Sequence, residues 1–156
     1  MKKLISNLSV LLLLVQNINA SMCTLENAKK LVENFISNEI ECGKHNTLIC
    51  EFKSKKMISR NSIEKAGINL KFLKAEKYKI NSWLIEDYKI INSIDKGNNI
   101  SFTLELYNYS NNWYKKTEIR VVDENNKCKI LPSRINSPDS NPVFITPYFN
   151  SSHHKM

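Results

Sequence analysis

The chain has few of the residues that metal binding and acid–base catalysis most often use. Only three of its 156 residues are histidine, and two of them, His153 and His154, lie next to the C-terminus. The third, His45, lies between Cys42 and Cys50, whose spacing is not the CxxC of a zinc site. The sequence suggests no Ser-His-Asp or Cys-His arrangement for nucleophilic catalysis. We therefore predict no catalytic residue, no metal and no cofactor.

Long apolar runs are also missing. The longest, Leu8–Val15 (LSVLLLLV), is too short to span a bilayer. It follows Lys2 and Lys3 and precedes the small residue Ala20, which is the pattern of a secretory signal peptide. We therefore expect residues 1–20 to be removed and the mature chain to be periplasmic or secreted.

The mature chain is expected to carry no stable membrane anchor, because Met22 before Cys23 does not suit a lipoprotein cleavage site. Its size of roughly 136 residues is that of one domain. Hydrophobic and charged contents of 42% and 24% are typical of a globular protein. The net charge of +8 becomes +6 when Lys2 and Lys3 leave with the signal. In a cytoplasmic protein this excess would suggest nucleic acid as a partner, but an exported chain has little nucleic acid to meet.

Most lysines alternate with hydrophobic positions, as in Lys127–Ile130, which is typical of the solvent face of strands. The densest basic run comprises Lys53, Lys55, Lys56 and Arg60. We predict that this run is a solvated loop. The alternative is contact with anionic lipid headgroups or with an acidic partner.

An even number of cysteines in an exported chain indicates disulfide bonds. Four cysteines remain after cleavage: Cys23, Cys42, Cys50 and Cys128. Cys42 and Cys50 flank a short segment in which Gly43 can turn the chain, so we pair them with each other. This leaves Cys23 to pair with Cys128, across a long loop that would join the N-terminal helix to the last strand.

The N-terminal part of the mature chain has the pattern of an amphipathic helix. Thr24 is a suitable N-cap residue, and Glu26 lies in the first turn, where the helix dipole favours an anion. Apolar residues then recur every three or four positions as far as Ile40, and polar residues fill the other face. This predicts a helix of four to five turns that ends near Cys42-Gly43.

The next segment is predicted to contain one shorter helix. Residues 44–60 are polar and are expected to be irregular. The second helix is predicted to start at Asn61, because Asn61-Ser-Ile-Glu64 has the spacing of a capping box.

From Trp83 onward the apolar period changes to two, which predicts strands. The first strand covers about 83–94 and contains a bulge at Ile90-Ile91, where the alternation slips. Three further strands follow, beginning near Ile100, Trp113 and Lys127, and Asn-rich turns separate them. Consecutive strands joined by tight turns predict an antiparallel meander, one face of which the first helix would cover. The fold class is therefore α+β.

The segment after Pro132 carries three more prolines and ends in Ser-Ser-His-His-Lys-Met. Such a sequence predicts an extended or disordered tail over residues 136–156. The single domain is accordingly expected to cover residues 21–135.

The stretch from Asp87 to Ile130 reads DYKIINSIDKGNNISFTLELYNYSNNWYKKTEIRVVDENNKCKI. It combines a Tyr-rich strand, a Lys-Gly-Asn turn, an alternating strand, a strand that begins with Trp, and a final NNKCKI strand. With the helices before it, this order resembles NTF2-like (cystatin-like) domains, and most of all the small exported bacterial proteins of the DUF3828 type. The resemblance covers about residues 24–135. It implies a long and a short helix packed on a curved antiparallel meander, in a cone whose concave side can form a pocket.

The same fold hosts enzymes, transport factors, secretion-system subunits and toxin-neutralising immunity proteins, so the fold does not decide the function. An enzyme on this scaffold would need an acid or base inside the cone. Glu86 and Asp87 are the best candidates by location, since they lie in a strand beside Trp83 and Tyr88. We favour a solvated or hydrogen-bonded role for both carboxylates.

Aromatic residues are concentrated in the predicted sheet, and core or cross-strand packing accounts for most residues of this kind. A pocket on the concave side would be lined by Trp83, Tyr88, Phe102 and Trp113. On the outer face, near one turn, the candidates for a surface that contacts a protein are Tyr107, Tyr109 and Tyr114.

Three functions are compatible with these observations. The leading hypothesis is a non-enzymatic exported binding protein with a protein partner in the periplasm, such as an immunity or inhibitor protein against a secreted toxin or a cell-wall hydrolase. The second is a small-ligand-binding or enzymatic protein that uses the interior of the cone. The third is an accessory subunit of an envelope or secretion assembly, held by an uncleaved N-terminal segment.

Overall fold

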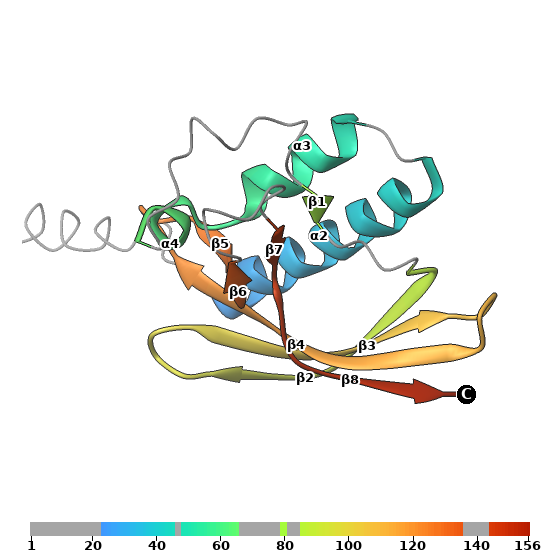
Figure 1. Cartoon of the computed structure of the whole chain (residues 1–156). Helices are drawn as coiled ribbons and strands as arrows, with labels where there is room; N and C mark the ends of the chain where they lie inside the picture. Colours follow the sequence, from blue (N-terminus) through green and yellow to red (C-terminus); the bar gives the residue numbers. More distant parts are fainter. Residues whose placement is uncertain (1–22, 46–47, 66–78, 81–84, 136–143) are drawn as a thin grey trace, which may run out of the picture.

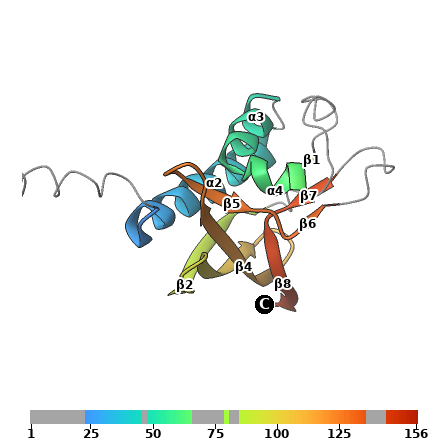
Figure 2. The ribbon, with the colours of Figure 1, turned by 90° about the vertical axis from the view of Figure 1, so that its left-hand side faces the viewer.

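A computed structural model describes residues 23–45, 48–65, 79–80, 85–135 and 144–156. These residues form helices and an open, curved antiparallel sheet, so the α+β fold class is confirmed (Figure 1). The helices are α2 (Leu25–His45), α3 (Leu48–Met57) and α4 (Arg60–Lys65). All three lie on the same side of the sheet (Figure 2).

The main sheet has five strands, and buried residues alternate with more exposed ones along β3 and β4. They are β2 (Asp87–Asp95), β3 (Ile100–Asn108), β4 (Trp113–Asp123), β5 (Cys128–Leu131) and β8 (Tyr148–Lys155). Strands β2 to β5 form the predicted meander. Both β8 and β5 pair with β4: β8 pairs with its first part and β5 with its last part. A second, three-stranded sheet contains β1 (Lys79–Ile80), β7 (Phe144–Thr146) and β6 (Arg134–Ile135), in that order.

The core lies between α2 and the inner face of the sheet. The buried stripe of α2 consists of Ala28, Val32, Phe35 and Ile36. It belongs to the same buried cluster as inward side chains of β3 and β4, among them Phe102, Leu104, Leu106, Ile119 and Val121. These residues follow the 3.6 and 2.0 periods that the sequence showed, and burial of their apolar surface is the main term that favours the fold.

The turns between strands explain the many asparagines of this region. Asn112, Asn125 and Asn126 have positive φ angles of 54°, 56° and 60°, and Gly97 has a φ of 80°. Asparagine and glycine adopt this left-handed conformation at lower cost than other residues do. The predicted bulge in β2 is also confirmed, because the register against β3 shifts between Ile90 and Asn92.

Two predictions about the helices are wrong. The segment 44–60 is not irregular, since α3 occupies most of it. Its sequence, LICEFKSKKM, spreads apolar and charged residues around the helix, so no amphipathic period marks it. The helix that was predicted to start at Asn61 is α4, and it begins at Arg60 instead. Its N-cap is Ser59, whose Oγ accepts a hydrogen bond from the backbone N–H of Ser62 at 3.2 Å.

The described part of the predicted tail, residues 144–156, is extended, as one of the two alternatives predicted, but it does not lie outside the domain. Strand β8 forms an edge of the main sheet, with register pairs that run from Ile119↔Tyr148 to Trp113↔Lys155. The polar sequence of β8 has no apolar alternation, and its pairing depends on backbone hydrogen bonds. The predicted boundary at residue 135 is therefore corrected.

Cys23 and Cys128 form a disulfide bond with their Cα atoms 4.9 Å apart, which is the predicted pairing. It links the residues before α2 to the start of β5, and the backbone N–H of Cys23 also donates to Oδ2 of Asp123 at 2.8 Å. Cys42 is buried on α2. The side chain of Cys50 lies outside the described residues, so the Cys42–Cys50 pair stays a prediction.

We predict that the Cys23→Ala/Cys128→Ala variant unfolds more easily than the natural chain. A loop of this length gives an upper value of about 4–5 kcal/mol for the loss in the free energy of unfolding. Urea denaturation without reductant measures it. Urea denaturation of the variant with reductant then measures any contribution of a Cys42–Cys50 bond to the free energy of unfolding. A loss below about 1 kcal/mol would show that this bond does not stabilise the fold.

Candidate functional site

Four aromatic rings form a continuous row across the outer face of the sheet. Tyr107 on β3 lies directly opposite Tyr114 on β4, and Tyr114 lies opposite His154 on β8. The ring centroids of Tyr107 and Tyr114 are 6.1 Å apart, and those of Tyr114 and His154 are 4.7 Å apart and stacked. Tyr109, just after β3, stacks on Tyr107 at 5.7 Å with an angle of 6° between the planes. We call Tyr107, Tyr109, Tyr114 and His154 the aromatic row.

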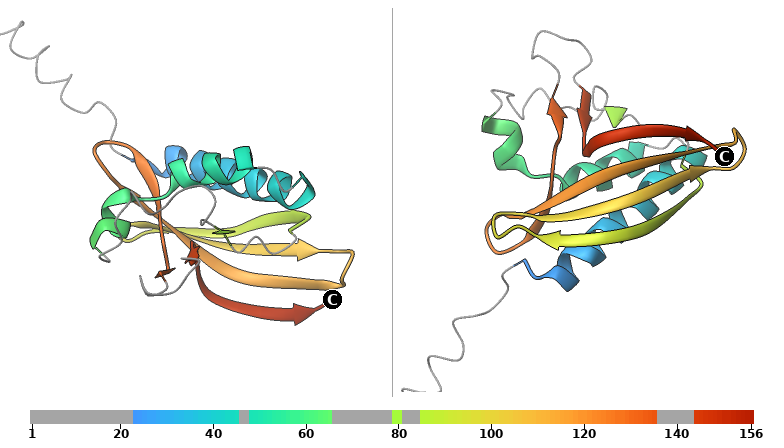
Figure 3. Two further views of the ribbon diagram at one scale, coloured as in Figure 1. Left: turned by 45° about the horizontal axis from the view of Figure 1, so that its top comes forward. Right: turned by 90° about the horizontal axis from the view of Figure 1, so that it is seen from below.

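Successive side chains of a strand point to opposite faces of the sheet, and this alternation places the row on the outer face. Leu104 and Leu106 of β3 point into the core, so Tyr107 points to the opposite face. No described helix or strand covers that face, which the right-hand view of Figure 3 shows. The row therefore combines the three tyrosines that the sequence predicted as a contact surface with a histidine from the tail.

Carboxylates fix the tyrosine end of the row. The hydroxyl of Tyr107 donates to Oε2 of Glu105 at 2.6 Å, and the hydroxyl of Tyr109 donates to Oδ2 of Asp87 at 3.1 Å. The hydrogen bond to Glu105 raises the pKa of Tyr107 to about 12, and the bond to Asp87 raises the pKa of Tyr109. Both phenols are therefore neutral donors at pH 7, and Tyr109 is 56% exposed.

The two carboxylates considered for catalysis have hydrogen-bonded roles here. The side chain of Glu86 accepts backbone N–H bonds from Tyr109 at 2.9 Å and from Ser110 at 3.2 Å, which holds the turn that carries Tyr109. A hydrogen bond from the side chain of Ser110 lowers the pKa of Glu86 most, and the two backbone bonds lower it further. Asp87 is exposed and binds Tyr109. Neither carboxylate lies in the interior of the fold.

A charged cluster lies on the same outer face, farther along β4. Oε1 of Glu118 accepts from Nε of Arg120 at 2.8 Å and from Nζ of Lys96 at 3.3 Å, and it also accepts from Ser101. The guanidinium of Arg120 lies 4.0 Å from the ring centroid of Phe149 on β8. The hydrogen bond from Arg120 is the largest cause that lowers the pKa of Glu118 to about 2.

The structure describes three of the four residues predicted to line an interior pocket. Trp83 lies outside the described residues. Phe102 is fully buried in the core and pairs with Ile119, whereas Trp113 pairs with Asn108 at the other end of the two strands. Tyr88 is half-buried against the core, and Trp113 contacts His153 edge-on at 5.6 Å.

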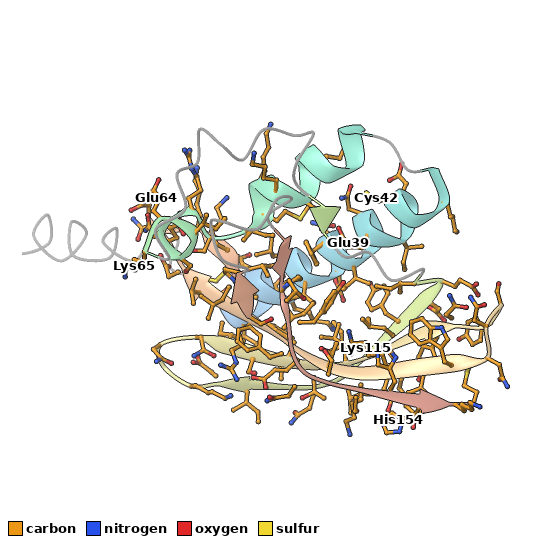
Figure 4. All side chains as sticks on the ribbon, viewed as in Figure 1. Glu39, Cys42, Glu64, Lys65, Lys115 and His154 are labelled. Carbon is orange, nitrogen blue, oxygen red and sulfur yellow. A yellow bond between two sulfur atoms is a disulfide. The ribbon has the colours of Figure 1, made fainter. Side chains whose placement is uncertain are left out.

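A buried polar cluster between α2 and β4 was not predicted from the sequence. Glu39 is 1% exposed, and its Oε1 accepts from Oγ of Ser54 at 2.6 Å. Lys115 is 4% exposed, with its Nζ 5.2 Å from the ring centroid of Tyr148. Figure 4 labels Glu39 on α2 and Lys115 on β4, on the two sides of the layer between helix and sheet. Lys115 and Ile119 are four residues apart on β4 and therefore point to the same face of the sheet. The alternation of β4 could thus have predicted that Lys115 points inward.

Burial changes the titration of this cluster. It lowers the pKa of Lys115, and together with the charge of Glu39 it raises the pKa of Tyr148 well above its ordinary value. The hydroxyl of Tyr148 is buried and has no hydrogen-bond partner among the residues that the structure describes. We call Glu39, Ser54, Lys115 and Tyr148 the interior polar cluster.

Within the described ranges, no three side chains of His, Cys, Asp or Glu come close enough to hold a metal ion together. In the same ranges, no helix has both the length and the apolar character needed to cross a membrane. Comparison of the chain with family models, with curated proteins and with solved structures gives no match.

The charged cluster around Glu118 predicts a pH dependence of stability. The pKa of Glu118 is lower in the folded chain than the ordinary 4.5, so its contribution is complete above about pH 4.5 and is lost as the pH falls towards 2. We expect Glu118→Gln to be less stable than the natural chain at pH 7, and the difference to shrink below pH 4.5. Urea midpoints at pH 7, 4 and 2.5 measure it. A difference that stays constant over this range would contradict the assignment.

Proposed function

We propose that the protein is a non-enzymatic, exported binding protein of NTF2-like fold, and that the aromatic row is its contact surface for a protein partner in the periplasm. The continuous row of ring contacts from Tyr109 through Tyr107 and Tyr114 to His154 on the uncovered face is the observation that carries this proposal. The order of a long helix, shorter helices and a curved, unclosed meander supports the proposed fold family.

The chemistry of the row suits a protein interface. Tyrosine supplies a large contact area with few rotatable bonds, and its hydroxyl can exchange a hydrogen bond with the partner. Here the rings are held by each other and by carboxylates, so little side-chain freedom is left to lose on binding. Pre-ordered aromatic residues of this kind are typical centres of binding energy.

The charges around the row limit which partners fit. Glu86, Asp87 and Glu105 lie beside the tyrosine end, and Lys116 follows Tyr114 on β4 in an exposed position. A partner with basic groups opposite the carboxylates and an apolar patch opposite the rings would be complementary to this surface. A small, exported domain with such a surface fits an immunity or inhibitor protein that blocks a secreted toxin or a cell-wall hydrolase.

The interior polar cluster favours a second candidate, a small-ligand-binding or enzymatic pocket. A buried lysine and a buried carboxylate with shifted titration are frequent in binding sites, although structural networks show the same shifts. Phe102 and Leu104 fill the neighbouring part of the interior, which supports the binding-surface proposal over this one.

We predict that Tyr107→Ala/Tyr114→Ala weakens binding of the partner by about tenfold or more, because central aromatic residues carry most of the energy of an interface. The natural chain, immobilised and oxidised, is incubated with envelope extract, and recovered proteins are quantified by mass spectrometry. The partner should be recovered with the natural chain and lost with the variant.

Ile94→Ala is the matched control, since Ile94 is 50% exposed on the same sheet but outside the row. It should recover the partner as the natural chain does. If no protein depends on Tyr107 and Tyr114 for recovery, the proposed contact surface is wrong.

A further inference from the structure

The short helices and β5 carry a second surface, which the proposed function does not use. It consists of Lys53, Lys56, Arg60, Lys65, Lys127 and Lys129, which we call the basic surface. All of these side chains are exposed except Lys129, which is half-buried. Two of the residues belong to α3, two to α4, and two flank Cys128 at the start of β5.

Backbone contacts hold these elements together. Ile58 forms a parallel bridge with Ile130, and the N–H of Ser59 donates to the carbonyl of Ile130 at 2.8 Å. The ammonium of Lys129 donates to the backbone carbonyl of Lys56 at the end of α3. The end of α3, the start of α4 and the start of β5 therefore meet, although about 70 residues of sequence separate Lys56 from Lys129.

Within the described residues, cations outnumber carboxylates on α3, α4 and β5, and Asp123 of β4 lies opposite Cys128. Among the described side chains of α3 and α4, Glu64 is the only carboxylate, and Figure 4 shows it labelled beside Lys65. Glu124 is buried, and its Oε2 accepts from Oγ of Ser59 at 2.5 Å. Burial and the charge of Arg60 lower the pKa of the neighbouring Lys55, as expected where cations are crowded.

The geometry points to anionic phospholipid headgroups as the partner of the basic surface. Lysine and arginine gathered on one surface are attracted to phosphate-bearing leaflets within a Debye length. The disulfide bond places Cys23 beside Cys128, and hence beside Lys127 and Lys129. The apolar run Leu8–Val15 ends eight residues before Cys23, a stretch that spans about 28 Å at most. Before residues 1–20 are removed, this run in a membrane would hold the basic surface near the headgroups, and after their removal the charges of the surface alone attract it to them.

This orientation also directs the aromatic row away from the lipid. Asp123, opposite Cys128, and Tyr114 lie on the same strand β4, nine residues or about 30 Å apart. A chain docked through its basic surface would present the row towards the aqueous compartment. The inference does not depend on which protein the row binds.

The test is co-sedimentation of the full chain with two kinds of vesicle, one of phosphatidylcholine alone and one of equal parts phosphatidylcholine and phosphatidylglycerol. The chain should bind the anionic vesicles at least about tenfold more strongly at about 0.1 M salt, and lose most of this preference at about 0.5 M. The variant K53Q/R60Q/K65Q/K127Q should lose the preference for anionic vesicles.

The matched control is K44Q/K89Q/K116Q/K155Q, which removes the same charge from exposed positions outside the basic surface. It should keep the preference to within about threefold. An equal loss in both variants would show that only net charge acts, and equal binding to both vesicles would show that the apolar run alone binds. Either result overturns the proposal.

A second measurement needs no variant. Anionic vesicles should protect Lys53, Lys65 and Lys127 from acetylation in the natural chain, while Lys89, Lys116 and Lys155 stay reactive. Uniform reactivity with and without vesicles would overturn the proposal, as would protection of the natural chain by single-stranded DNA but not by vesicles.

Discussion

Burial of the apolar stripe of α2 on one face of the sheet is the constraint on which the other features depend. Phe35 and Ile36 belong to the same buried core as Phe102 and Leu104, and all four are fully buried. Because side chains alternate along a strand, this contact decides which residues of β3 and β4 face outward. A shift of one residue in either strand would bury the tyrosines and expose the leucines.

The same alternation separates the protein into regions with different chemistry. The outer face carries neutral, hydrogen-bonded phenols and charged side chains, among them the partly buried ion pair of Glu118 and Arg120. The inner face carries the apolar core, but near β8 it also holds Lys115 and Tyr148, whose burial opposes ionisation. The bridge between Ile58 and Ile130, and the pairing of β5 with the last part of β4, place the basic surface at the end of β4 away from the aromatic row.

The strands of the meander and the first helix could be predicted because their apolar residues recur with a clear period. Apolar residues every two positions defined β3 and β4, and the slip at Ile90-Ile91 defined the bulge. Helix α3 and strand β8 could not be predicted, because their residues carry no period and tertiary pairing decides their structure. For the same reason the sequence showed Tyr107, Tyr109 and Tyr114 as one surface but not His154, which joins them only through β8.

The rate of tyrosine modification in the native chain tests most directly which face of this sheet is buried and which is exposed. Nitration followed by peptide mass spectrometry measures each ring separately. We expect Tyr109, which is exposed, to react fastest and the half-buried Tyr107 and Tyr114 to react more slowly. Tyr148 should react only after unfolding, because it is 5% exposed. Rapid nitration of Tyr148 together with protection of Tyr107 and Tyr114 would show that the opposite face of the sheet is buried.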